Sequence, residues 1–199
     1  MGSASVVGVL ALQGDVVEHL RAFTQLDVQA VAVKTRAELD AVDALVVPGG
    51  ESTTVIRLLD RFELAEPLRA RVKEGMPFWG TCMGLILAAA DVAGLEQKTL
   101  GLIDVTVRRN AFGRQFASAE VPLVIPALGE QPFPAIFIRA PWIERAGPGV
   151  EVLATYGGHG VFVRQRNVMG TAFHPELTSD PRVHAYFMRM LSERANVAA

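Results

Sequence analysis

The sequence predicts an α/β fold with a mostly parallel central sheet and antiparallel strands added to it. In the first half of the chain, short apolar runs rich in β-branched residues alternate with segments that have helical spacing. Strands and helices that alternate in this way form βαβ units, whose strands pair in parallel. From residue 103 onward, short runs of alternating polarity are separated by Gly and Pro turns, which is typical of antiparallel strands.

Four strands are expected in the first half, each a short apolar run of the kind that is buried on both faces of a parallel sheet. They span residues 6–12, 28–33, 44–47 and 78–80. Helices are expected between them, because apolar residues recur there every three or four positions. The first helix follows Asp15, which is expected to cap it, and carries Val16, Leu20 and Phe23 on its apolar side. The later helices span residues 53–60, 63–73 and 85–90.

Six shorter runs in the second half predict the added antiparallel strands. They span residues 103–107, 120–125, 135–138, 150–155, 160–164 and 168–172. A last helix is expected after Ser179 or Asp180 as its cap, with Pro181 in its first turn. Its buried side would consist of Val183, Phe187, Met190 and Leu191. Because no linker, repeat or low-complexity segment interrupts residues 1–199, we expect a single domain.

The composition argues against several classes of protein. The chain has 199 residues, half of them hydrophobic and a fifth charged, which is typical of a compact globular protein. With 19 basic and 21 acidic residues and no basic cluster, it offers no evident surface for nucleic acid or an anionic membrane. A single cysteine forms no internal disulfide, and no apolar run approaches the roughly 20 residues of a membrane-spanning helix. The N-terminal apolar segment lacks the basic start of a signal peptide, so we expect a cytoplasmic protein.

Cys82 is the first candidate for chemistry. It is the only cysteine, and Gly80 and Gly84 around it give the G-x-C-x-G pattern of a nucleophile elbow between a strand and a helix. The glycines permit the close backbone approach that such a turn needs, and the positive end of the helix dipole favours the reactive thiolate. The backbone N–H of Met83 would then face an oxyanion. From this motif alone, the alternative is a buried structural cysteine.

His174 is the candidate base, because a cysteine nucleophile needs an imidazole and the imidazole needs an orienting carboxylate. It follows the last expected strand, and Glu176 lies two positions later, so both side chains would point the same way in an extended segment. Structural roles are expected for the other three histidines. These are His19 in the first helix, His159 in a glycine turn and His184 in the last helix.

Residues 48–52, with the sequence Pro-Gly-Gly-Glu-Ser, follow a strand and precede a helix. Such a loop forms either an anion-binding or oxyanion loop, or an ordinary tight turn in which Ser52 caps the helix. It lacks the lysine of a P-loop. Neither a metal nor a cofactor is expected, because one cysteine and four scattered histidines show no ligand spacing.

Taken together, residues 48–52, 80–84 and 173–176 resemble, in order and spacing, the motifs of class I glutamine amidotransferases. Further stretches are similar to the glutaminase subunits of pyridoxal 5'-phosphate synthase. These stretches are residues 8–14, 18–19, 49–54, 109–115, 137–141 and 174–178. The resemblance covers the whole chain and implies one flavodoxin-like three-layer sandwich. It also implies a subunit that hydrolyses L-glutamine and passes ammonia through a channel to a separate barrel-shaped synthase (lyase) subunit in a large hetero-oligomer.

The resemblance implies roles for individual residues. Cys82 would attack the amide and form a glutamyl thioester, His174 would move protons, and Glu176 would orient His174. The family's glutamine-binding positions correspond to Gly50, Glu51, Ser52, Arg109, Ile138 and Arg139. Arginines suit such a site because they bind carboxylates through two parallel hydrogen bonds. The oxyanion hole would use Gly50 and Met83, although alanine is common in the family where Met83 stands, and Gln13 would contact the partner.

Three alternatives to this function are considered. The chain could serve another class I amidotransferase, such as one for histidine biosynthesis, although the stretches around Arg109 and Arg139 argue against this. It could be a cysteine peptidase or chaperone of related fold, which the His174–Glu176 pair disfavours. It could also be a non-catalytic subunit that binds glutamine or a partner. Such a subunit would have no chemical need for Cys82, His174 and Glu176 together.

Overall fold

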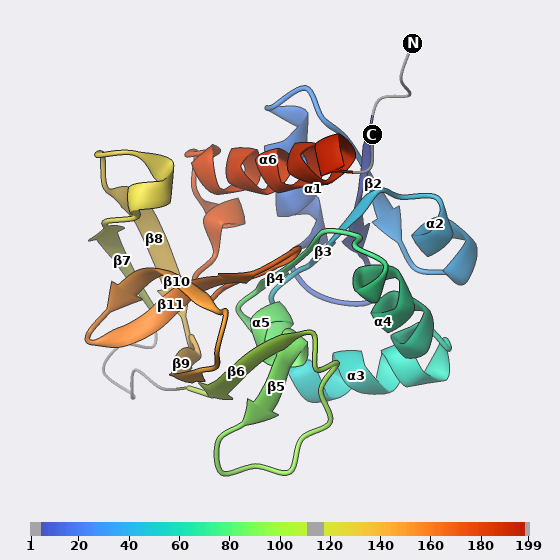
Figure 1. Cartoon of the computed structure of the whole chain (residues 1–199), viewed down its shortest axis with the longest axis horizontal. Coiled ribbons are helices and arrows are strands. Elements are labelled where there is room, and N and C mark those ends of the chain that lie inside the picture. The colour runs from blue at the N-terminus through green and yellow to red at the C-terminus, as the bar shows by residue number, and fades with distance from the viewer. Residues whose placement is uncertain (1–4, 111–117, 198–199) are drawn as a thin grey trace.

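A computed structural model of the chain describes residues 5–110 and 118–197 (Figure 1). The elements of the first half are β1 (Val6–Leu10), α1 (Val16–Thr24), β2 (Gln29–Val33), α2 (Arg36–Asp40), β3 (Ala44–Val47), α3 (Ser52–Arg61), α4 (Ala65–Lys73), β4 (Phe78–Thr81), α5 (Met83–Ala88) and β5 (Ala89–Val92). The second half adds β6 (Ile103–Arg108), β7 (Ser118–Leu123), β8 (Phe133–Ile138), β9 (Trp142–Ala146), β10 (Glu151–Tyr156), β11 (His159–Gln165), β12 (Val168–Thr171) and α6 (Arg182–Val197). The predicted order of strands and helices is confirmed, with α2, β5 and β9 in addition.

A 10-stranded sheet runs through the molecule in the order β2-β1-β3-β4-β12-β11-β9-β6-β5, and β10 pairs with β11 beside this path. The strands from β2 to β12 in this order are parallel to one another. β11 joins β12 in the antiparallel direction and begins the added part of the sheet. β7 and β8 form a separate antiparallel pair. The predicted fold class, a mostly parallel central sheet with appended antiparallel strands, is confirmed.

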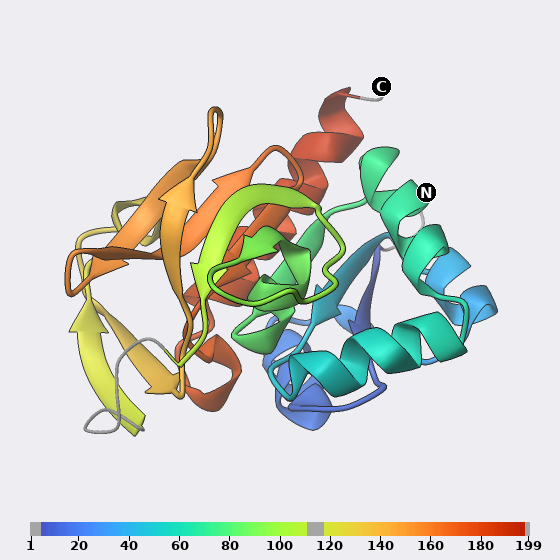
Figure 2. The ribbon, with the colours of Figure 1, turned by 90° about the horizontal axis from the view of Figure 1, so that it is seen from below.

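Helices cover both faces of the parallel strands. α1 and α6 lie on one side, and α3, α4 and α5 lie on the other, which gives three layers (Figure 1). β7 and β8 lie at the end of the molecule opposite to α2 (Figure 2). The apolar residues predicted to face inward from α6 are all buried, and Phe187 packs against Trp79 of β4 with ring centroids 5.6 Å apart. Within the described residues, no helix is both long enough and apolar enough to span a membrane.

One local prediction is wrong, and one helix was not expected. Residues 89 and 90 are expected in the helix after Cys82, but Ala89 has φ −58° and ψ 153° and begins β5, which pairs in parallel with β6. A short apolar run has the same appearance in a buried helix as in a buried strand, so its periodicity does not separate them. Helix α2 was not expected, although Thr35 and Glu38 form the capping box that marks its start.

Candidate active site

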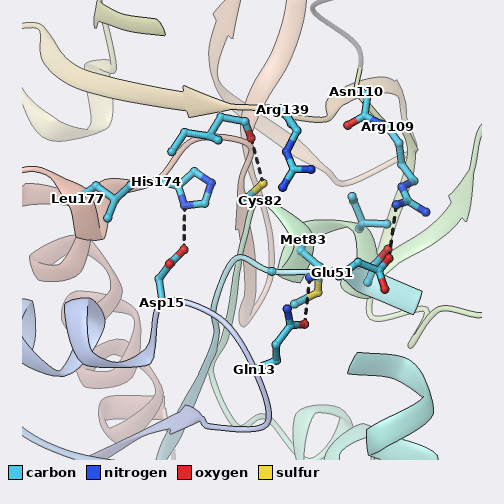
Figure 3. Close-up of a pocket in the computed structure, with 14 residues that line it drawn as sticks. Gln13, Asp15, Glu51, Cys82, Met83, Arg109, Asn110, Arg139, His174 and Leu177 are labelled. Atoms are coloured by element: carbon cyan, nitrogen blue, oxygen red, sulfur yellow. Dashed lines mark hydrogen bonds and ion pairs between the residues drawn. The ribbon is translucent and has the colours of Figure 1, made fainter. Parts of the chain in front are cut away.

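A pocket of about 370 Å³ lies at the carboxyl ends of the parallel strands, among the loops that follow β1, β3, β4 and β12 (Figure 3). Ligands of open α/β sheets bind at this edge, where loops from several strands converge. The lining residues are Gln13, Asp15, Gly50, Glu51, Ser52, Cys82, Met83, Ile86, Arg109, Asn110, Ile138, Arg139, His174 and Leu177. Every site residue predicted from the sequence lines this pocket except Glu176, which is buried and contacts His174.

Cys82 stands at the sharp turn between β4 and α5. Its φ of 48° and ψ of −101° lie outside the regions that non-glycine residues favour, and such strain is concentrated at functional sites. The Cys82 N–H donates to the carbonyl of Thr171 in the neighbouring strand at 2.7 Å. A Cβ atom at Gly80 would lie 2.3 Å from the carbonyl carbon of Gly84, and one at Gly84 would lie 2.1 Å from the carbonyl oxygen of Val47. Both positions therefore require glycine, as the elbow pattern predicts.

The thiol of Cys82 lies inside the pocket wall. The residue is 8% exposed, and its Sγ donates to the carbonyl oxygen of Ile138 at 3.8 Å. Ile138 ends β8, and Arg139 follows it with a positive φ of 44°. The chain segment at Ile138 and Arg139, far from Cys82 in the sequence, thus contacts the thiol, and Arg139 lies beside Cys82 in the view of Figure 3.

His174 and Glu176 come from the segment after β12. His174 Nδ1 lies 2.7 Å from Glu176 Oε1, and a short 3₁₀ turn at Pro175–Leu177 brings the two together, rather than the extended segment expected from the sequence. Burial lowers the pKa of His174, but contacts with Asp15, Cys82 and Glu176 outweigh it and raise that pKa well above its usual range. Burial raises the pKa of Glu176, against the lowering effect of His174. Both directions indicate that a proton stays in the Nδ1–Oε1 hydrogen bond.

Asp15 approaches the same imidazole from the start of α1. It is expected to cap that helix, but its side chain makes no cap hydrogen bond. Instead, Asp15 Oδ2 lies 3.4 Å from His174 Nδ1 (Figure 3). From the sequence, Asp15 is expected only as a cap, and its contact with His174 is not expected. The signal that was available is its position in the loop after β1, because such loops meet at the edge of a parallel sheet.

The loop after β3 is held by Gln13 and by its own glutamate. The Glu51 N–H donates to Gln13 Oε1 at 3.1 Å. The Glu51 carboxylate accepts hydrogen bonds from the backbone N–H groups of Thr53 and Thr54, so Glu51 caps α3, and the reading of Ser52 as the cap is wrong. Burial opposes ionisation, but these hydrogen bonds lower the pKa of Glu51 to about 2. The carboxylate is therefore charged at neutral pH.

Two arginines bring positive charge to the side of the pocket away from Asp15 (Figure 3). Arg109 Nη1 donates to Gln97 Oε1 at 2.8 Å, and its Nη2 lies 3.7 Å from Glu51 Oε1. Arg139 lies between Cys82 and Arg109 in the view of Figure 3. Of the predicted binding stretch 109–115, residues 111–115 lie outside the described residues.

Comparison with known proteins shows which family has this arrangement of motifs. The model of the SNO glutamine amidotransferase family matches residues 9–193. The chain belongs to the SNO glutamine amidotransferase family. The resemblance noted in the sequence is thereby confirmed, and with it the class of enzyme.

Individual relatives of this amidotransferase are similar over nearly their whole length. A Mycobacterium sp. (strain KMS) protein named pyridoxal 5'-phosphate synthase subunit PdxT is 57% identical over 195 residues, which cover 95% of this chain and 94% of that protein. A protein of the same name from Moorella thermoacetica is 50% identical over 185 residues, with 93% and 98% covered. A protein whose crystal structure is described as a glutamine amidotransferase is 46% identical in sequence. The match covers 94% of this chain and 100% of that protein's chain, with a TM-score of 0.89.

The other histidines of the amidotransferase do not line this pocket. His19 and His184 are fully buried and contact each other between α1 and α6. His159 begins β11 and stacks on Trp142 with ring centroids 3.6 Å apart and an angle of 8° between the planes.

Among the described residues, one group could offer ligands to a metal ion. Asp15, His174 and Glu176 hold potential ligand atoms within 4.8 Å of one another. The Nδ1 atom of His174, however, already bonds Glu176, which is the arrangement of a base with its orienting carboxylate. The absence of a metal from the reaction stays a prediction.

Proposed function

We propose that this amidotransferase hydrolyses the side-chain amide of L-glutamine, with Cys82 as nucleophile, His174 as proton carrier and Glu176 as the orienting carboxylate. The observation that carries the proposal is a strained cysteine elbow in the same pocket as an imidazole that bonds a buried carboxylate. Membership of the glutamine amidotransferase family supports glutamine as the substrate.

The proposed reaction has two halves. The thiolate of Cys82 attacks the amide carbon of glutamine, the carbon–nitrogen bond breaks, and His174 donates the proton with which ammonia leaves. The product is a γ-glutamyl thioester. His174 then removes a proton from water, the resulting hydroxide attacks the thioester, and the carbon–sulfur bond breaks to release glutamate and the thiolate. The Glu176 bond to Nδ1 directs the other ring nitrogen, Nε2, to this work.

The charged groups of the pocket suit the α-amino acid end of glutamine. The guanidinium groups of Arg109 and Arg139 would bind the α-carboxylate, because arginine offers paired donors in a fixed plane. The carboxylate of Glu51 would face the α-ammonium group, and its lowered pKa keeps it ionised. Gly50, Ser52 and Ile138 would shape the remaining wall, which they line.

The oxyanion of the tetrahedral intermediates needs donors close to Cys82. The N–H of Met83 is suited to this, because the first N–H groups of a helix have no partner within it. The second donor would be the backbone of Gly50, whose position depends on the hydrogen bond between Gln13 and the next residue of the loop, Glu51. A contact of Gln13 with a partner protein would therefore adjust the oxyanion hole.

We extend the proposal to a two-protein enzyme. Relatives that are 50% and 57% identical carry the name pyridoxal 5'-phosphate synthase subunit, so this chain would supply ammonia to a synthase (lyase) subunit in a hetero-oligomer. A closed channel between the two sites would serve this purpose, because ammonia released into water becomes protonated and unreactive. The chain would act as a single cytoplasmic domain.

A glutaminase assay with and without the candidate synthase tests the proposal. We expect wild-type chain to release glutamate slowly alone and about 10²- to 10³-fold faster with the synthase, if the partner completes an oxyanion donor. Cys82→Ala should fold normally and release no glutamate, and no thioester should appear in its mass spectrum. Residual activity of Cys82→Ala equal to wild type would refute the nucleophile, and a rate unaffected by the synthase would refute the coupling.

A further inference from the structure

Glu176 has a second carboxylate oxygen that the proposed triad leaves unused. Its Oε1 bonds His174, whereas its Oε2 is buried and accepts no hydrogen bond from the described residues. His19 Nε2 lies 3.5 Å from this Oε2, and the side chains of His19 and Glu176 are both completely buried. A buried carboxylate oxygen is costly unless a donor compensates it. His19 is placed to be that donor.

The ring of His19 is held in position on its other sides. Its Nδ1 lies 3.1 Å from His184 Nε2, although the two residues are 165 positions apart in the sequence. Trp79 packs edge-on against it with ring centroids 5.2 Å apart. On the side that faces Glu176, Nε2 also hydrogen-bonds Thr81 Oγ1 at 3.4 Å. A ring packed this closely has few alternative rotamers, so Nε2 stays directed at Glu176 and Thr81.

The available partners favour one arrangement of protons. If His19 carries its proton on Nε2, it donates toward Glu176, and its Nδ1 accepts from His184 Nε2–H. His184 Nδ1, which has no partner among the described residues, then carries no proton and presents only a lone pair. In the reverse arrangement, His184 Nδ1 is a buried N–H without an acceptor, which is the rarer and costlier situation. Burial is the main cause that lowers the pKa of both His19 and His184, so both rings are neutral.

We propose that His19 is a positioning residue of the glutaminase, whose Nε2–H holds Glu176 Oε2 and so keeps the other oxygen turned toward His174. The inference rests on the proposed function, because it assumes that Glu176 orients His174. Contacts then run from Cys82 through His174 and Glu176 to His19. His19 touches none of the reacting atoms, and it acts only through the carboxylate.

The variants His19→Gln and His19→Asn distinguish the effect of the hydrogen-bond donor from the effect of ring packing. Glutamine places its amide nitrogen near the position of Nε2, whereas asparagine places it near Nδ1. We expect His19→Gln to keep kcat within about threefold, and His19→Asn to lower kcat about 10- to 100-fold at unchanged KM, the range known for outer-shell partners of metal ligands. The assay uses the full chain with its synthase and glutamine as substrate. Equal kcat values for the two variants would overturn the proposal.

Phe23→Leu is the matched packing control. Phe23 is buried in the same helix, and its ring lies 5.0 Å from that of His184, but it has no donor for Glu176. We expect a lower Tm and a kcat within about twofold, because packing alone is removed. A loss of kcat as large as that of His19→Asn would attribute the effect to packing and overturn the donor role.

Nitrogen NMR of the wild-type imidazoles tests the same proposal without a variant, and it decides the matter if His19→Asn does not fold. We expect a proton on Nε2 of His19 and none on its Nδ1. The reverse tautomer would overturn the proposal. Failure of wild-type chain with its synthase to hydrolyse glutamine would instead count against the proposed function, so the two failures are distinguishable.

Discussion

His174 Nδ1 and Glu176 Oε1 lie 2.7 Å apart, and the two side chains are only 6% and 0% exposed. Asp15 also reaches His174 Nδ1, but at 3.4 Å and with a side chain that is 39% exposed. A short hydrogen bond away from water is stronger and more directional than a longer one at the surface. In the proposed triad, Glu176 rather than Asp15 would therefore set the orientation of the imidazole, and Asp15 would add charge.

Glu176→Gln should lower kcat for glutamine hydrolysis about 10²- to 10⁴-fold, because it removes the charge that orients and stabilises the imidazolium. Asp15→Asn is the matched change at the weaker contact and should cost less than about tenfold. Both are measured with the synthase present and the substrate saturating. A larger loss in Asp15→Asn than in Glu176→Gln would reverse the assignment of the orienting carboxylate.

Arg139→Met should raise KM for glutamine about 10- to 100-fold, since a hydrogen bond to a charged group contributes about 1.5–3 kcal/mol. The effect on kcat should be smaller, because the α-carboxylate is distant from the bond that breaks. Arg108→Met is the control, since Arg108 pairs with Glu144 and does not line the pocket. If both variants raise KM equally, general charge rather than a specific contact is responsible.

Glu51→Gln should make stability less dependent on pH in the acid range. The pKa of Glu51 is lowered to about 2 in the folded chain from an ordinary value of 4.5, so its stabilisation is present above pH 4.5 and is lost as the pH falls toward 2. At pH 6 the free energy of unfolding of wild type should exceed that of Glu51→Gln by about 0.5–1 kcal/mol, as expected for a helix cap. The difference should be smaller at pH 3.

Thermal unfolding at a series of pH values measures this difference. Glu130→Gln removes the same charge from an exposed loop and serves as the reference. A difference between wild type and Glu51→Gln that is constant from pH 6 to pH 3 would contradict the cap assignment.

Gly80→Ala should destabilise the chain by about 3 kcal/mol or more in urea unfolding, because the added Cβ meets the backbone of Gly84 and a rigid turn has no room to adjust. Gly94→Ala provides the comparison. Gly94 has a positive φ of 71°, but a Cβ there meets nothing within 4 Å, so the cost should be only about 1–2 kcal/mol. Similar costs at the two positions would mean that backbone conformation, and not the close approach at the elbow, decides the requirement for glycine.

The fold followed from sequence where a pattern is local. The apolar runs of β2, β3 and β4 and the helical spacing of α3, α4 and α6 are visible in the sequence, because each depends on residues within one or two turns of one another. The pattern failed at Ala89, where the backbone conformation depends on pairing with Ile103. Whether a short apolar run becomes a helix or a strand is decided there by its neighbour in the sheet.

The sequence by itself determined the elbow around Cys82 and the proximity of His174 to Glu176, since each involves residues a few positions apart. Only the tertiary structure decided that Asp15 contacts His174 and that His19 Nε2 faces Glu176 Oε2. The physical reason is that two residues can meet at the sheet edge whatever their separation in the sequence, so no spacing pattern predicts the contact. It arises because parallel strands direct their carboxyl ends to one side, where loops from distant parts of the sequence share a single buried volume.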